Sequence, residues 1–174
     1  MSGIVIEGIY RDRLTGPAGE LVFDSGWRHN LIALQGRRLL AGFMKNEATA
    51  QGVQSMKIGR GDAAWDAVSP PEADATAIVQ LVDATPFVIS GANLVLQYLT
   101  PTDTPTPNVT NRVQITATLG PGQPTPATQP PYPMREFGLF GRMSGNDFMI
   151  DYIRHPLIEK DGLLTLERKV RLIF

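Results

Sequence analysis

The last eleven residues, Leu164 to Phe174, constrain the fold more than any other part of this 174-residue chain. Their even positions are apolar except for Arg168, and their odd positions are mostly polar or charged. A period of two is typical of a β-strand that has one face in a core and the other in water. Because the apolar face continues to Phe174, we expect this strand to be built into a sheet along its whole length.

Composition narrows the class of protein. The chain has 16 Lys and Arg against 17 Asp and Glu and carries a net charge of −1, which argues against nucleic acid as the main ligand. It contains no cysteine, so no disulfide or thiolate metal site supports the fold. The length fits a single domain spanning residues 1–174. No run of about 18 apolar residues and no basic, apolar N-terminal leader appears, so we expect neither a membrane span nor a secretory signal.

One substantial helix is expected over Leu31 to Lys45. Apolar residues recur there at helical spacing, and Asn30 is positioned as an N-cap. Gly36 and Gly42 lower the intrinsic stability of this helix, so we expect it to pack against a sheet and to use its glycines for close approach. The stretch from Ala75 to Asp83 fits either a helical turn or a strand.

Short apolar or alternating runs predict the strands. They fall at Gly3 to Tyr10, Glu20 to Phe23, Met56 to Ile58, Phe87 to Ser90, Leu94 to Leu99, Arg112 to Leu119, Arg135 to Phe140, Phe148 to Ile153 and Leu163 to Phe174. The first two are separated by a turn-rich cluster and predict a hairpin. Together with the helix, these runs predict a mainly β protein: an antiparallel β-sandwich with one packed α-helix.

Two proline-rich stretches, residues 100–110 and 120–133, flank the strand Arg112 to Leu119 and cannot pair as central strands. They should lie at opposite ends of the sheet, roughly 25 to 30 Å apart at about 3.3 Å per residue. They are either arms that contact neighbouring molecules or stiff, solvated connections. If they are arms, the candidate contact residues are Pro101, Pro105, Pro107, Pro124, Pro126, Pro130 and Pro131, together with Arg168 and Phe174 of the last strand.

Catalytic and metal-binding patterns are not found. His29 and His155 are far apart in sequence, outside any metal-ligand spacing, and are expected to be capping or surface residues. The glycines around Arg60 lack the lysine and the strand-to-helix context of a nucleotide site. We therefore predict no catalytic residue, no metal and no cofactor, and a protein that is not an enzyme.

Arg168 interrupts the apolar face of the last strand, and a buried charge needs a partner. Glu136, beside the core-like Phe137, is the candidate within the chain, and a carboxylate on a neighbouring subunit is the other. If such a pair exists, Arg168→Leu should impair stability or assembly.

Two short motifs carry a resemblance to a known group of proteins. Ile58, Gly59, Arg60 and Gly61 match an "I-G-x-G" turn that follows a leucine-rich helix, and Arg135 to Phe140 matches an "R-E-x-G-L-F" segment before a closing strand. This order resembles tailed-bacteriophage virion proteins of the tail, baseplate or neck and collar. The resemblance covers most of the chain after Asp24, although its two proline-rich stretches are longer than the group's usual turns.

The resemblance implies a non-enzymatic structural subunit of a virion, assembled in the bacterial host cytoplasm. Its partners would be copies of itself in a ring and other virion proteins, and it could serve as an attachment point for fibres. A phage, a gene-transfer particle and an injection device share such parts. The alternative is a receptor- or glycan-binding β-sandwich of a phage fibre, in which aromatic side chains would stack on sugar; the candidates are Trp27, Trp65, Tyr98 and Tyr132.

Overall fold

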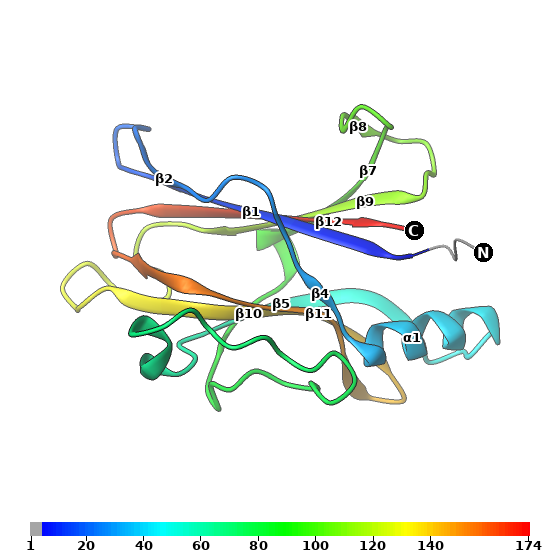
Figure 1. The fold of residues 1–174 in the computed structure, drawn as a ribbon. Coiled ribbons are helices and arrows are strands. Elements are labelled where there is room, and N and C mark those ends of the chain that lie inside the picture. Colours follow the sequence, from blue (N-terminus) through cyan, green and yellow to red (C-terminus); the bar gives the residue numbers. More distant parts are fainter. Residues whose placement is uncertain (1–4) are drawn as a thin grey trace.

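The computed structural model describes residues 5–174 and consists mainly of two antiparallel β-sheets that face each other (Figure 1). The sheets are curled, and together they form the expected β-sandwich. The helix α1 lies beside the lower sheet of Figure 1, close to the end of the molecule at which the described part of the chain begins and the C-terminus lies. Long loops cover the outer face of the same sheet.

Sheet A is the upper layer in Figure 1, and its strands follow the order β2-β1-β12-β9-β7-β8, with β3 also pairing with β1. The predicted C-terminal strand is β12, which lies between β1 and β9 and is therefore a central strand. The strands are β1 Glu7–Thr15, β2 Leu21–Asp24, β3 Arg28–His29, β7 Leu94–Leu99, β8 Pro105–Thr106, β9 Arg112–Leu119 and β12 Thr165–Ile173. The hairpin of β1 and β2 confirms the predicted one, although residues 3–4 of that prediction lie outside the described residues.

Sheet B is the lower layer, with the order β4-β11-β10-β5-β6. Its strands are β4 Leu31–Ile32, β5 Gln51–Gly59, β6 Phe87–Ile89, β10 Tyr132–Met143 and β11 Asn146–Lys160. Both faces of β10 are covered, because the sandwich core packs on one side and the loop segment of residues 60–85 on the other. That loop contains the short 3-10 helix Ala63–Asp66, and a second 3-10 helix, Gly91–Asn93, precedes β7.

The helix begins later than predicted. α1 spans Leu34–Met44, its N-cap position is Ala33, and no side chain caps it. The predicted cap, Asn30, instead lies where the chain crosses from sheet A to sheet B. Its backbone N–H donates to the carbonyl of Gly8 in β1 over 3.0 Å, and its side-chain amide donates to Asp151 in β11. Leu31 and Ile32, which the apolar spacing assigned to the first helical turn, therefore form the strand β4 and pair with sheet B.

The two helix glycines permit the close approach that the sequence predicted. A Cβ at Gly36 would lie 2.6 Å from the carbonyl oxygen of Ile150 in β11. At Gly42 it would lie 2.9 Å from the sulfur of Met143 in β10. α1 therefore packs with its backbone almost directly on sheet B.

His155 lies inside β11 and is only 3% exposed, so the predicted capping or surface role is wrong for this histidine. Met134 pairs with Ile158 and Glu136 with Arg154, so one residue of β10 faces three residues of β11. This bulge tolerates the missing N–H of Pro156 and turns the imidazole into the core. His29, in contrast, is exposed at the edge of sheet A.

The segment from Ala75 to Asp83 begins with a single helical turn, in which the N–H of Ile78 donates to the carbonyl of Asp74 over 2.9 Å, and continues as bends without forming a strand. Ile78 and Leu81 pack against a small apolar cluster on the outer face of sheet B. Within residues 5–174, no helix is long and apolar enough to cross a lipid bilayer.

Candidate functional site

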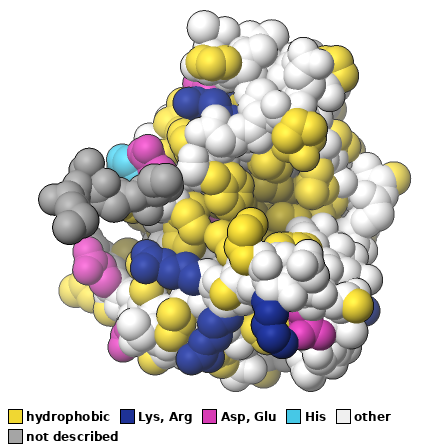
Figure 2. All heavy atoms as spheres, turned by 90° about the vertical axis from the view of Figure 1, so that its right-hand side faces the viewer, with side chains coloured by type: hydrophobic (Ala, Val, Ile, Leu, Met, Phe, Trp, Pro, Cys, Tyr) yellow, Lys and Arg dark blue, Asp and Glu magenta, His cyan; other side chains and the backbone are white. Residues whose placement is uncertain are grey.

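An apolar cleft opens between the two sheets at the end of the molecule that carries α1. Its volume is about 340 Å³, and Figure 2 looks directly at it, with hydrophobic side chains lining the hollow. Sheet A contributes residues of β7, β9 and β12, and the other wall comes from α1 and sheet B. The predicted contact residue Phe174 lies in this lining and is 38% exposed.

The cleft is an uncovered part of the core. Leu96 lies opposite Ile115 in the register of β7 and β9, so both side chains point to the same face of sheet A. Ile115 is completely buried, whereas Leu96 is 45% exposed. On the facing wall, Phe43 of α1 is 38% exposed. The two sheets diverge here, and the inner surfaces that meet elsewhere are left open to water.

At the opposite end of the sandwich, at the left of Figure 1, β2 is the edge strand of sheet A. Leu21, Val22 and Phe23 of β2 are 53%, 54% and 37% exposed. Within residues 5–174, β2 pairs only with β1, so its outer edge has unused backbone donors and acceptors.

The first proline-rich loop, residues 100–110, lies at the cleft end. Its Pro105 and Thr106 form β8, which pairs with Leu99 and Tyr98 of β7. Asp103, at a φ of 64°, accepts hydrogen bonds or ion pairs from Arg112 and Arg171. The loop is thus held against its own sheet, and the three prolines Pro101, Pro105 and Pro107 remain exposed.

The second proline-rich loop, residues 120–133, lies at the opposite end, and its base is bound to the turn before β12. The buried Lys160 donates to the carbonyls of Gly120, Asp161 and Leu164. Burial lowers the pKa of this lysine. A Cβ at Gly162 would lie 2.3 Å from the backbone nitrogen of Ala127, so the loop packs closely on this turn. Within the loop, Pro124 is half-buried, and Pro126, Pro130 and Pro131 are exposed.

Arg168 is completely buried, and its partner is Asp12 of β1 rather than the predicted Glu136. Nε and Nη2 donate to the two carboxylate oxygens of Asp12 over 2.5 and 2.8 Å. The guanidinium also lies 4.1 Å from the ring centroid of Phe137. Glu136 lies on the face of β10 opposite to its neighbour Phe137, because successive residues of a strand alternate between faces. It therefore points away from Arg168, and the predicted pair of Glu136 and Arg168 does not form.

His155 completes the Arg168 cluster and links sheet A to sheet B. Its Nδ1 lies 2.8 Å from the Pro156 carbonyl oxygen, which can only accept, so Nδ1 carries the proton. Nε2 is then free to accept from Nη2 of Arg168 over 3.1 Å. Burial, followed by the charge of Arg168, lowers the pKa of His155 to about 4.

Glu136 anchors the loop segment of residues 60–85 on the outer face of sheet B. Its carboxylate accepts the backbone N–H groups of Val82 and Asp83 over 3.0 and 2.7 Å and the hydroxyl of Tyr152. It is completely buried. These three hydrogen bonds stabilise the buried carboxylate, so Glu136 does not need an arginine as a partner.

Arg135 holds the other end of the same loop. Nε and Nη2 donate to both carboxylate oxygens of Asp66 over 2.8 and 2.6 Å, and Nη1 donates to the carbonyl of Arg60 over 2.9 Å. Gly61 adopts a φ of 58° beside this arginine. The two motifs that carry the phage resemblance therefore form a single structural unit, since Glu136 pairs with Gly59 across β10 and β5.

Gly59→Ala should destabilise the protein by about 1–3 kcal/mol, because the added Cβ would lie 2.5 Å from the Glu136 carboxylate. Gly52→Ala in the same strand is the matched control, since a Cβ there meets nothing within 4 Å. It should change the free energy of unfolding by less than about 1 kcal/mol. Urea denaturation of both variants measures the difference, and equal stabilities would contradict the close packing of the Glu136 carboxylate on Gly59.

The aromatic residues proposed to stack on sugar are not gathered on one surface. Trp65 and Tyr132 are only 9% and 2% exposed. Trp27 is half-buried, with the guanidinium of Arg171 3.9 Å from its ring centroid, and Tyr98 lies in the wall of the cleft.

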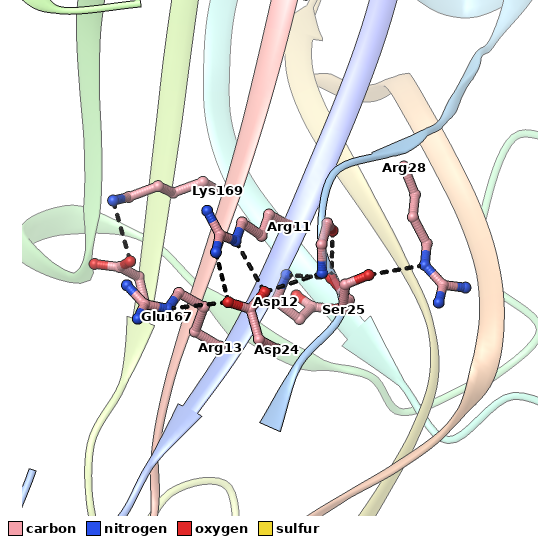
Figure 3. Close-up of polar contacts among 9 residues, drawn as sticks. Arg11, Asp12, Arg13, Asp24, Ser25, Arg28, Glu167 and Lys169 are labelled. Atoms are coloured by element: carbon pink, nitrogen blue, oxygen red, sulfur yellow. Dashed lines mark hydrogen bonds and ion pairs between the residues drawn. The ribbon is translucent and has the colours of Figure 1, made fainter. Parts of the chain in front are cut away.

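The outer face of sheet A is polar, and many of its charged side chains form ion pairs with one another (Figure 3). Arg11 and Arg13 both contact the carboxylate of Asp24, and Lys169 lies 3.1 Å from Glu167. The hydrogen bond from Arg11 lowers the pKa of Asp24. In Figure 3, Ser25 connects this surface to β1 through the backbone N–H of Asp12. The charged side chains on this face are therefore mainly paired within the chain.

Among residues 5–174, no three His, Cys, Asp or Glu side chains are grouped as a metal would require. Comparisons with protein-family models, with curated proteins and with solved structures found no match. The resemblance to virion proteins therefore stays a hypothesis.

Sequence reasoning missed the cleft, the Asp12 and His155 partners of Arg168, and the pairing of Asn30 with Asp151. Strand alternation places Phe137 and Glu136 on opposite faces, and this signal could have excluded Glu136 as the partner of a core arginine. The cleft left no such signal, because its residues have the same pattern as the closed part of the core.

Proposed function

We propose that this protein is a structural subunit, without an enzymatic role, of a tailed bacteriophage or phage-like particle. Its place would be the tail, the baseplate or the neck and collar, where it assembles in symmetric copies. The class of particle comes from the sequence order described above, in which the helix, the "I-G-x-G" turn, the "R-E-x-G-L-F" segment and a closing strand follow one another.

The uncovered core surface is the observation that carries a role in assembly. Leu96 of β7 and Phe43 of α1 are exposed in the cleft, although Leu94 in the same strand and Leu39 in the same helix are buried. A well-formed recess lined almost entirely by apolar side chains is a typical binding site for apolar groups of another molecule. A subunit of a repeated assembly would cover such a surface in every copy.

Particle association tests the proposal directly. Particles are purified by density-gradient centrifugation from a culture that produces them and the chain, and their proteins are identified by mass spectrometry. We expect the chain to co-sediment with particles in a constant ratio to the other virion proteins, and cryo-electron microscopy should place it in the tail, baseplate or neck. Recovery of the chain only in the particle-free supernatant would contradict the proposal.

A further inference from the structure

The two ends of the sandwich carry surfaces that complement each other. At one end the cleft is an apolar recess of about 340 Å³ between the sheets. At the other end, β2 presents Leu21, Val22 and Phe23 on an edge strand that projects beside the β1–β2 turn (Figure 1). One end lacks apolar side chains to close its core, and the other has apolar side chains without cover.

Water is a poor occupant of the cleft. At about 30 Å³ per molecule the space would hold roughly eleven waters, which need two to four polar partners each. Gln97 is the one lining residue with a polar side chain other than the Tyr98 hydroxyl. Apolar side chains from another molecule would replace this water at a gain in free energy.

The charges beside the two surfaces are of opposite sign. α1 borders the cleft and carries Arg37 and Arg38, both exposed, with no acidic residue in the helix. Arg37 lies one turn before Leu40, which lines the cleft. The apolar residues of β2 follow Glu20, whose side chain is exposed, whereas the carboxylate of Asp24 at their other end is already paired with Arg11 and Arg13. An edge strand that enters the cleft would bring an acidic flank towards a basic helix.

From this complementarity we infer that a second copy of this chain covers the cleft, by inserting β2 with Leu21, Val22 and Phe23. The inference deepens the proposed function and rests on it. The surfaces that meet are different and lie at opposite ends, so the contact is head-to-tail. A head-to-tail contact closes into a ring or continues as a filament, depending on the rotation between copies. The free edge of β2 adds backbone hydrogen-bonding groups to the same contact.

Paired substitutions at the two ends test the inference on the full chain. Val22→Asp places a charge on the strand that would be inserted, and Leu96→Asp places a charge in the wall of the cleft. Phe43→Glu is a second cleft variant on an exposed helical position, in case Leu96→Asp lowers stability. Val68→Asp is the matched control, because Val68 is 69% exposed, lies in the loop on the outer face of sheet B and belongs neither to the cleft lining nor to β2. Circular dichroism establishes that each variant is folded.

Analytical ultracentrifugation over a range of concentrations should show self-association of the wild-type chain and of Val68→Asp. Val22→Asp and each cleft variant should weaken it by about tenfold or more, as for a central apolar contact. Mixing Val22→Asp with a cleft variant leaves one intact interface, so the mixture should form a dimer and nothing larger.

A wild-type chain that stays monomeric throughout the range, or end variants that associate like the wild type, would overturn the inference. So would dimers formed by Val22→Asp or by a cleft variant alone. The proposed function is judged separately by particle association. A chain present in particles but without end-to-end contact would defeat only the inference, and a chain absent from particles would defeat the proposed function even if copies associate.

Discussion

Arg168→Leu should lower the free energy of unfolding by about 3–5 kcal/mol, because it leaves the carboxylate of Asp12 buried without its partner. Both side chains have no solvent exposure, so water cannot replace the lost contacts. Asp12→Leu should cost a similar amount, since it leaves the guanidinium uncompensated. Urea denaturation at pH 7 measures both effects.

The double variant Asp12→Leu/Arg168→Leu separates the pair from its surroundings. Replacing both charges of a buried pair by apolar groups is often neutral or stabilising, so the double variant should be more stable than either single variant. Lys169→Met is the matched control one residue along β12, because its ion pair with Glu167 is about one third exposed. It should change stability by less than about 1 kcal/mol. Additive costs in the double variant would show that the two charges do not act as a pair.

The pH dependence of stability should reveal a second effect, centred on Asp151. Burial raises the pKa of this carboxyl from its usual 3.8 to about 7, although the N–H of Leu139 and Arg168 favour the charged form. Between these values the unfolded chain is ionised at this position and the folded chain is protonated. Stability from Asp151 is therefore complete below pH 3.8 and falls by about 4 kcal/mol as pH rises to 7.

His155 acts in the opposite direction. Its pKa is lowered from 6.5 to about 4, so the unfolded chain takes up a proton at a pH where the folded chain does not. The stability associated with neutral His155 is present above pH 6.5 and falls by about 3 kcal/mol as pH drops to 4. Between pH 4 and 6.5 the two contributions cancel, and the contribution of this pair of residues to the wild-type profile should be nearly flat.

Asp151→Asn should remove this cancellation, so that stability rises by about 3 kcal/mol between pH 4 and 6.5 relative to the wild type. An asparagine keeps an acceptor for Leu139, and once the Asn30 amide flips it can donate to the Oδ1 atom of Asn30, which has no hydrogen-bond partner among the described residues. Asp147→Asn is the control, because Asp147 is an exposed carboxyl paired with Lys57. Urea denaturation from pH 4 to 8 measures the profiles, and parallel curves for Asp151→Asn and the wild type would exclude a raised pKa at this position.

Local patterns predicted much of the fold. The sequence boundaries of β7 and β9 agree with those of the structure, and β12 follows the predicted alternation with Arg168 on its inner face. These strands alternate because one face of each contacts the core, and this information lies within a few neighbouring residues. The close approach of the helix was likewise predicted from Gly36 and Gly42. The start of α1 was not, because Leu31 and Ile32 satisfy either a helical turn or the pairing with β11.

The sequence by itself determined the class of fold, the one helix apart from its start, the proline-rich stretches at opposite ends and the presence of a charge in the core. Only the tertiary structure decided which partner that charge has. Asp12 lies 156 residues before Arg168 and meets it because β1 and β12 pair in a register that places the two residues opposite each other. The tertiary structure also decided where the core stays open. The divergence of two sheets depends on how they pack along their whole length, and no local run of residues records it.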